Sequence, residues 1–172
     1  MSILKVAMLG NPVLRRKASA VKDAGHPDVQ RLVDDMLETM KEYNGVGLAG
    51  PQVHMPVRVI VVEAVKGAPW TTATALINPG FEPLSQQKGD DWEGCLSIAN
   101  MRGQVPRFRQ IRVSSLDRKG KALTFEATEF LARVIQHEVD HLEGVLFLDR
   151  MKDFATLTHM EEWQRFWLKK PV

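Results

Sequence analysis

Segment 128–142 constrains this chain most strongly, because its pattern predicts a helix that turns two histidines toward the protein core. Thr128 suits the N-cap position, and Gly144 follows the last turn, where glycine commonly ends a helix. His137 and His141 lie one turn apart on the apolar side. A buried imidazole costs free energy unless it has a polar partner. The fold must therefore bring a partner to both histidines.

The sequence QHEVDHLEG, residues 136–144, also places a glutamate between the two histidines. One row along the helix holds Phe130, Val134, His137 and His141, and the adjoining row holds Leu131, Ile135, Glu138 and Leu142. With this spacing two imidazoles can bind one metal ion while the glutamate projects beside it. An amphipathic helix that merely carries two histidines has the same pattern, so a further ligand must decide between the two interpretations.

Cys95 is the best candidate for a third ligand. It is the only cysteine of the chain and lies in WEGCLS, residues 92–97. A thiolate and two imidazoles suit a divalent transition metal, and three protein ligands leave a fourth position for water. The metal lowers the pKa of that water, and Glu138 can accept its proton. The alternative is that Cys95 binds no metal and packs in the core as a small apolar side chain.

The remaining patterns predict an α+β fold with mostly antiparallel sheets packed around the metal-binding helix. Apolar residues at three-to-four spacing predict a first helix over 27–43, and the glycine-rich stretch 45–52 is expected to be a loop without regular structure. Strands are expected at 57–65, at 73–85 with a break at Asn78-Pro79-Gly80, and in a hairpin over 111–128. A C-terminal helix is expected at about 155–170.

Length and charge narrow the class of protein. The 172 residues suit a single domain, 1–172, with a core of its own. A formal net charge of +2 gives no indication of sequence-specific nucleic-acid binding, and no apolar run reaches membrane-spanning length. A lone cysteine fits a reducing compartment. We expect a cytoplasmic protein, with an organelle copy as the alternative.

Three motifs occur in order: GVGLAGPQ at 45–52, EGCLS at 93–97 and QHEVDHLEG at 136–144. Together they resemble the three signature motifs of peptide deformylase, and the similarity extends from GNPVLRRKA at 10–18 to FLDRM at 147–151. Each motif alone is weak or moderate, but the three in order are highly specific. Members of this family are metal-dependent hydrolases of protein biosynthesis that remove the formyl group from the N-terminal formyl-methionine of new polypeptides and release formate.

The resemblance implies a role for each matching residue. Cys95, His137 and His141 would be the metal ligands. Glu138 would be the general base for a metal-bound water that attacks the formyl carbon, and would later pass the proton to the leaving amine. Gln52 and the backbone N–H of Leu96 would face the oxygen of the tetrahedral intermediate, as donors that stabilise it.

The resemblance also implies how a peptide would bind. The substrate backbone would lie like an added strand and form main-chain hydrogen bonds with Val46, Gly47 and Gly94. Arg102 matches an arginine that is paired with the motif glutamate, here Glu93, beside the peptide path. Phe130 and Val134 are candidate walls of the methionine pocket, with ordinary core packing as the alternative.

The same resemblance implies one divalent metal per chain. Fe²⁺ is the expected ion, and Ni²⁺, Co²⁺ or Zn²⁺ are alternatives in purified protein. Formyl-methionyl nascent peptides are the expected partners. The C-terminal helix is a candidate ribosome contact, and packing on the core is the alternative for it.

Two residues depart from the family pattern. Gly50 stands where a second alanine is usual, and we expect it to add flexibility at little cost to function. Arg133, one turn before His137, stands where bacterial members commonly have an apolar residue. The shape of the methionine pocket is therefore left open by the sequence.

Three other functions are compatible with parts of the pattern. A zincin-type peptidase shares His-Glu-x-x-His but lacks the cysteine ligand and the glutamine of the first motif. A metal that only stabilises the fold calls for a fourth protein ligand, and the chain has no second cysteine. A family member that only binds peptides or ribosomes would have lost a ligand or the glutamate, and none is lost here.

Overall fold

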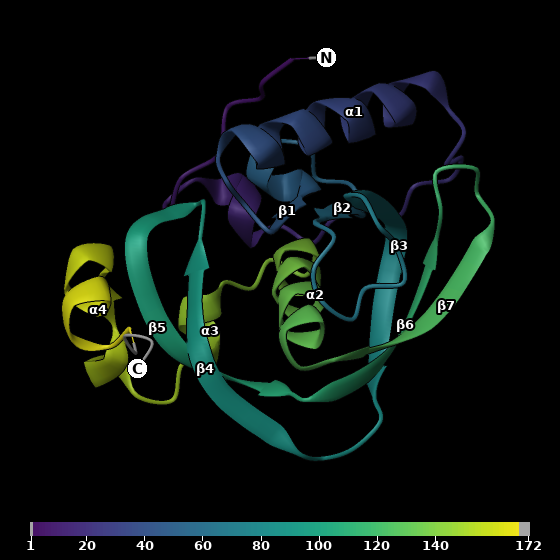
Figure 1. Ribbon diagram of the computed structural model, residues 1–172. Coiled ribbons are helices and arrows are strands. Elements are labelled where there is room, and N and C mark those ends of the chain that lie inside the picture. Colours follow the sequence, from purple (N-terminus) through teal and green to yellow (C-terminus); the bar gives the residue numbers. More distant parts are fainter. Residues whose placement is uncertain (1, 169–172) are drawn as a thin grey trace.

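Helix α2 (Glu129–Leu142) runs through the middle of the computed structural model, which describes residues 2–168 (Figure 1). Every residue from Leu131 to Leu142 is buried. A helix buried on all sides must contact other elements all round. Two antiparallel sheets and a set of short helices provide these contacts, so the predicted α+β fold around a central helix is confirmed.

The larger sheet has five strands in the order β1-β2-β3-β6-β7, and each pair of adjacent strands is antiparallel. The strands are β1 (Gly47–Ala49), β2 (Val59–Val62), β3 (Thr74–Pro83), β6 (Gln110–Leu116) and β7 (Ala122–Thr128). The smaller sheet consists of β4 (Lys88–Cys95), β5 (Ile98–Phe108) and β8 (Thr158–His159). Short helical segments complete the chain: η1 (Pro12–Arg15), η2 (Gly50–Val53), α3 (Phe147–Arg150) and η3 (Phe154–Thr156).

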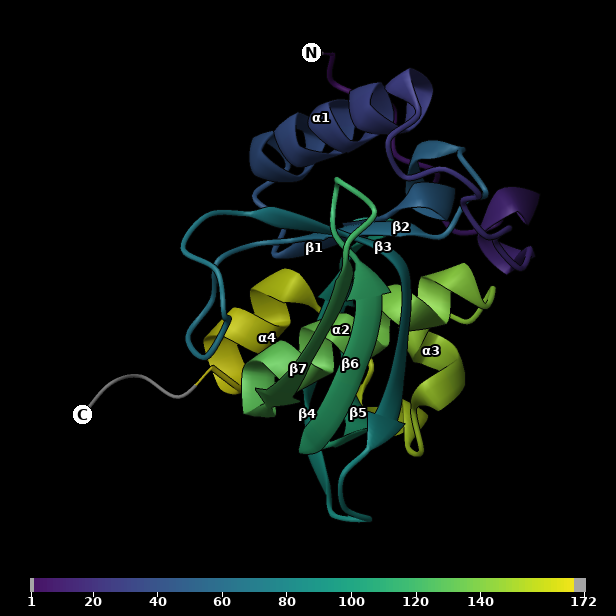
Figure 2. The same ribbon diagram turned by 90° about the vertical axis from the view of Figure 1, so that its right-hand side faces the viewer.

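Strand β2 shows why a continuous β-branched run forms here. Figure 2 shows helix α1 (Pro27–Glu42) and α2 on opposite sides of β1–β3. Ile60 and Val62 pack in the cluster that contains α2, whereas Val59 and Val61 pack in the cluster that contains α1. Because successive side chains of a strand point to opposite faces, a strand covered on both faces must be apolar at every position.

Two predictions for the larger sheet are wrong. Segment 45–52 is not irregular, because it contains β1 and most of η2. β1 exists because β2 offers it a partner far along the chain, which local composition does not reveal. The break expected at Asn78-Pro79-Gly80 is absent: β3 is continuous, with a register shift between Ile77 and Gly80. Asn78 has φ 51°, and its side chain bonds the backbone N–H and C=O of Val21.

The C-terminal helix is shorter than the predicted 155–170. Helix α4 comprises Met160–Phe166, and it follows η3 and β8. β8 forms because Thr158 and His159 pair with β5, and the His159 side chain then caps α4 by accepting from the backbone N–H of Glu161. Lys169 and Lys170, expected at the end of this helix, lie outside the described residues. Within residues 2–168, no helix is long and apolar enough to cross a membrane.

Gly144 ends α2 in the left-handed region, with φ 74°. A Cβ at this position would lie 2.6 Å from the carbonyl oxygen of Arg15, so an alanine is excluded by packing as well as by backbone conformation. Gly67 has φ 87° but no atom within 4 Å of its Cβ position. A substitution at Gly67 therefore costs only the free energy of the left-handed backbone conformation, whereas a substitution at Gly144 adds the cost of a steric clash.

We expect Gly144→Ala to lower the free energy of unfolding by about 3 kcal/mol, and Gly67→Ala by about 1 kcal/mol, because only the first adds a clash to the left-handed penalty. Urea unfolding of both variants measures the difference. Equal losses would contradict the close packing of η1 against the end of α2.

Candidate active site

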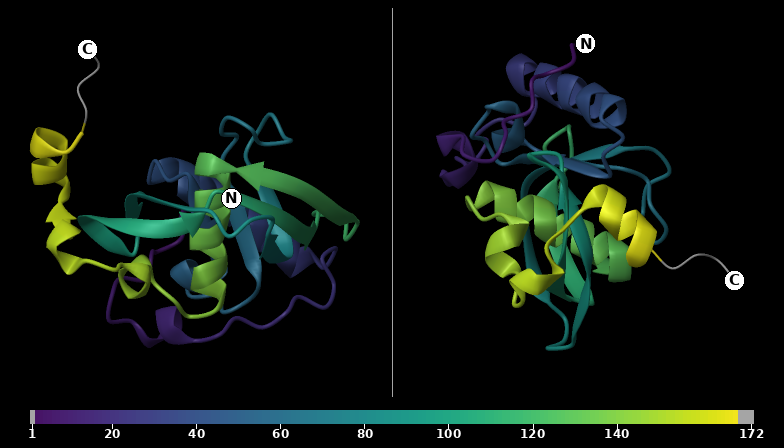
Figure 3. Two further views of the ribbon diagram at one scale, coloured as in Figure 1. Left: turned by 90° about the horizontal axis from the view of Figure 1, so that it is seen from below. Right: turned by 90° about the vertical axis from the view of Figure 1, so that its left-hand side faces the viewer.

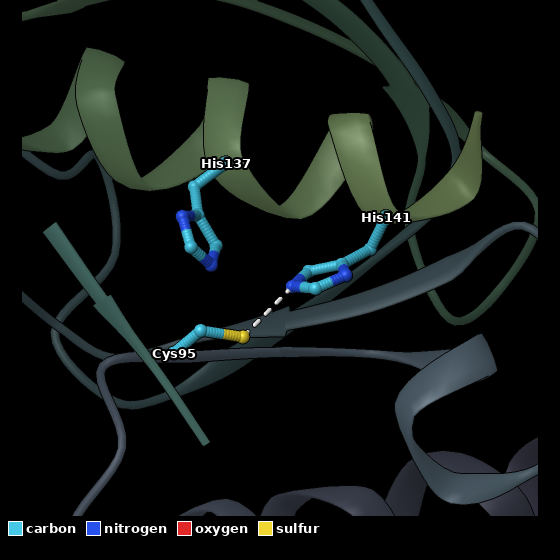
Figure 4. A group of neighbouring side chains, drawn as sticks. All are labelled: Cys95, His137 and His141. Carbon is cyan, nitrogen blue, oxygen red and sulfur yellow. Dashed lines mark hydrogen bonds between the residues drawn. The ribbon is translucent and has the colours of Figure 1, made fainter. Parts of the chain in front are cut away.

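Cys95 and the two histidines come together from different elements (Figure 4). Cys95 is the last residue of β4, and His137 and His141 lie one turn apart on α2. Their ligand atoms all lie within 4.8 Å of one another, and Cys95 Sγ is 3.2 Å from His141 Nε2. Figure 4 shows both rings directed toward the space beside the sulfur.

These three residues fit a divalent transition metal. Metal–ligand bond lengths place the ligand atoms of a tetrahedral site about 3.5 Å apart, which matches the spacing of this group. Burial lowers the pKa of His141 well below its usual value, so its imidazole is neutral, the form that binds metals. One sulfur and two nitrogen donors suit iron, nickel, cobalt or zinc.

A buried carboxylate holds His137 in place. Glu93 on β4 is 5% exposed, and its oxygens accept hydrogen bonds from Arg107, Arg133 and His137 at distances of 2.8–3.0 Å. Burial alone would raise the pKa of Glu93, but the hydrogen bonds from His137 and Arg107 hold that pKa well below its usual range. The bond to Nδ1 leaves Nε2 of His137 directed toward Cys95, the arrangement typical of a metal ligand.

The partner of Glu93 differs from the expected one. The family resemblance predicts a pair between Arg102 and this glutamate, but Arg107 is the arginine of β5 that pairs with it. The register of the β4–β5 hairpin decides which side chain of β5 reaches Glu93. In this register Glu93 pairs with Gly103, and the register shifts between Glu93 and Cys95. Nothing in the sequence distinguishes the two arginines, because a shift of register is a non-local property.

Arg133 does not place a free charge in the cavity. Its guanidinium donates to Glu93 and to the backbone carbonyls of Val105 and Gly89, the latter two at 2.7 Å. The side chain is 10% exposed. The departure from the family pattern at this position therefore adds a second arginine to the Glu93 network.

Glu138 is buried beside the candidate metal-ligand group. It is 4% exposed, and Oε2 has no hydrogen-bond partner among residues 2–168. Burial raises the pKa of Glu138 to about 7. Gly47 of β1 makes room for it, since a Cβ on Gly47 would lie 2.4 Å from Glu138 Oε1. A carboxyl group with a pKa near neutrality can both accept and donate a proton.

Gln52 points its amide nitrogen at Cys95. Its Oε1 accepts from the backbone N–H of Ala49 at 2.8 Å, which fixes the orientation of the amide. Nε2 then lies 3.4 Å from Cys95 Sγ and 3.2 Å from Ser97 Oγ. The backbone N–H of the next residue after Cys95, Leu96, has no hydrogen-bond partner within the described part of the chain. The site thus holds two N–H donors close to Cys95 in the chain or in space.

Gly50 precedes this glutamine and is closely packed. A Cβ there would lie 2.7 Å from the carbonyl oxygens of Met55 and Val57. The expectation that Gly50 adds flexibility is therefore wrong. As the chain is folded here, even an alanine would require the loop to shift.

A cavity of about 720 Å³ opens onto the group, a size typical of small-ligand sites. Nine of the ten site residues predicted from the sequence line it: Val46, Gly47, Gln52, Gly94, Cys95, Leu96, Arg102, His137 and Glu138. The tenth, His141, is 1% exposed and lies outside this lining. Phe130 and Val134 line it as expected, whereas the sequence offered no indication of Trp92 or Met160.

Strand β1 borders the cavity as an outer strand of its sheet. The carbonyl of Val46 is already engaged, since it accepts from the backbone N–H of Glu63. Main-chain groups alternate in direction along a strand, so those of Gly47 point to the open edge. The expected main-chain contact is therefore available at Gly47 and not at the Val46 carbonyl.

A family model described as polypeptide deformylase matches residues 3–156. The chain belongs to this family. Peptide deformylase 2 of Nostoc sp. is 41% identical over 167 residues, which cover 94% of this chain and 93% of the relative. A crystal structure of the class I type b peptide deformylase from Acinetobacter baumannii with Met-Ala-Ser bound has a TM-score of 0.81 and 38% identity, covering 88% of this chain and all of that one. The protein is thus a metal-dependent hydrolase of N-terminal processing.

We expect Cys95→Ser to lose most of its bound metal on dialysis, with affinity weakened more than about 100-fold, because a hydroxyl is a poor substitute for a thiolate. Metal per chain by elemental analysis is the measurement. His54→Ala is the matched control, because His54 is exposed and lies outside the group. Full metal retention by the serine variant would contradict the site.

Proposed function

We propose that this deformylase removes the formyl group from the formyl-methionyl end of newly made polypeptides, with Glu138 moving the protons. The observation that carries the proposal is a buried carboxylate, with Oε2 unpartnered among residues 2–168, beside three candidate metal-ligand atoms at a cavity. Acid–base chemistry and metal chemistry are therefore available at one point.

Cys95, His137 and His141 would hold one divalent metal. When bound, the metal would supply Lewis-acid polarisation of the formyl group and make a hydroxide nucleophile accessible at neutral pH. Fe²⁺ is the proposed ion, and Ni²⁺, Co²⁺ and Zn²⁺ suit the same ligands. A thiolate beside ferrous iron would make Cys95 the first target of oxidation.

Glu138 would accept the proton of the attacking water and then donate it to the departing amine. A pKa of about 7, raised by burial, suits both steps, because the group can change protonation state at neutral pH. Gln52 Nε2 and the N–H of Leu96 would donate to the oxygen that becomes negative in the transition state. The bond from Ala49 to Gln52 Oε1 supports this role, since it holds the amide in place before the substrate arrives.

The substrate main chain would add to the open edge of β1 at Gly47 and pass Gly94 on β4. Peptides commonly bind to exposed sheet edges in this way. The methionine side chain would lie against Phe130 and Val134, which line the cavity. The Met-Ala-Ser complex of the Acinetobacter baumannii relative supports a peptide of this kind as the occupant.

Two competing functions fit less well. A metal that only stabilises the fold calls for a fourth protein ligand, and the candidate group within residues 2–168 has three members. A zincin-type peptidase does not account for Cys95 or for the amide of Gln52 beside it. Ribosome contact through α4 and a cytoplasmic location stay predictions from the sequence.

We expect Glu138→Gln to keep its metal and to lower kcat by about 100-fold or more, because the proton acceptor is lost while the ligands stay. Formate release from formyl-Met-Ala-Ser, with bound metal quantified on the same anaerobic sample, is the measurement. Glu129→Gln is the matched control, since Glu129 is an exposed acid on the same helix. If kcat of Glu138→Gln were close to that of the wild type, Glu138 could not be the proton acceptor.

A further inference from the structure

Helix α4 covers one wall of the cavity from outside. Figure 3 shows α4 against the smaller sheet, away from β1 and β2. Its first residue, Met160, lines the cavity. Trp163 and Trp167 pack against Trp92, with ring centroids 6.3 and 5.5 Å apart, and Trp92 is itself a lining residue. The C-terminal segment therefore contributes to the shape of the site.

Trp163 also contacts Arg102, a residue of β5 that lines the cavity. The guanidinium carbon of Arg102 lies 5.2 Å from the centre of the Trp163 ring, which is a cation–π contact. The guanidinium also lies close to Gly94, where a Cβ would be 2.8 Å from Nη1. Arg102 thus contacts both a tryptophan of α4 and the backbone of β4 at the residue before Cys95.

Among the described residues, no side-chain or backbone acceptor receives a hydrogen bond from the Arg102 guanidinium. Among residues 2–168 it forms no ion pair and no side-chain hydrogen bond, and its Nε is buried without a partner. Arginine stays charged in proteins and carries five N–H donors. Leaving such a donor unpaired is costly, and an acceptor brought by a ligand would remove that cost.

The backbone ties the same two elements together. Arg102 pairs with Thr158 of β8, directly before α4, and the neighbouring Met101 pairs with His159. The backbone N–H of Gln104 donates to Thr156 Oγ1. The position of Trp163 over the guanidinium is therefore set by the pairing of β8 with β5, so α4 is attached to the strand that carries Arg102.

We propose that Trp163 is a positioning residue that holds Arg102 for substrate recognition beyond methionine. This inference extends the proposed function. Arg102 donates to an oxygen acceptor of the second or third residue of the peptide, either a main-chain carbonyl or a carboxylate. Segment 158–167 is then a part of the peptide site, and its contacts affect long substrates more than short ones.

The test compares kcat/KM for formyl-Met-Ala-Ser with kcat/KM for formyl-methionine amide, which has no residue beyond methionine. We expect Trp163→Leu to lower the ratio of the two values about tenfold, and Arg102→Gln to lower it about 30-fold, through KM more than kcat. The double variant should match Arg102→Gln alone, because Trp163 acts through Arg102. Equal losses on both substrates, or additive losses in the double variant, would overturn the proposal.

Matched controls separate this role from a structural one. Phe166→Leu removes an exposed aromatic ring from the same helix without touching Arg102, and should leave the ratio unchanged. Trp163→Phe keeps a ring over the guanidinium and should restore most of the ratio, which keeps the test open if Trp163→Leu does not fold. A phenylalanine variant as defective as the leucine variant would count against the proposal.

Two further measurements identify the acceptor on the peptide and test the proposed function independently of the role of Trp163. If the Arg102→Gln effect disappears with formyl-Met-Ala-Ser amide, the acceptor is the terminal carboxylate, and if it persists, the acceptor is a carbonyl. Wild-type formate release from both substrates tests the proposed function separately. If the wild type released no formate, the proposed function would be contradicted. If formate is released but the ratio is unchanged in the variants, only the role of Trp163 is contradicted.

Discussion

The buried carboxylate of Glu93 is the interaction on which the rest of the site depends. It joins β4, β5 and α2, because its partners Arg107, Arg133 and His137 come from two of these elements. Removing one partner of such a buried ion pair costs about 3–5 kcal/mol, although an apolar replacement of the whole set can be neutral. Its importance lies in geometry: it fixes the ring of His137 relative to Cys95, which lies two residues after Glu93 at the end of β4.

The packing of α2 against the larger sheet brings the second half of the site together. One side of α2 lies in the cluster with β2, β3 and β6, which sets the depth of the helix. The opposite side turns His137 and Glu138 toward the cavity. β1 approaches α2 so closely at Gly47 that no side chain fits there. A single buried helix thus supplies core packing, two ligand atoms and the carboxylate, each on a different part of its surface.

Local patterns in the sequence were sufficient for the elements that depend on local periodicity. Helix α1, helix α2 and strand β2 follow from the spacing of apolar residues, and the motif residues identify the candidate metal ligands. Features set by distant partners were not predictable in this way. β1 needs β2 beside it, the unbroken β3 needs Asn78 to bond Val21, and α4 begins at Met160 because His159 pairs with β5. The exchange of Arg102 for Arg107 has the same cause, since it depends on the register of one hairpin.

The proposed function requires one ion, held by Cys95, His137 and His141, for formate release. The most direct measurement adds Fe²⁺ anaerobically to metal-free protein and follows formate release from formyl-Met-Ala-Ser against metal bound per chain. We expect activity to rise in proportion to occupancy and to stop rising at about one ion per chain. Formate release without metal, or full occupancy without formate, would contradict the account.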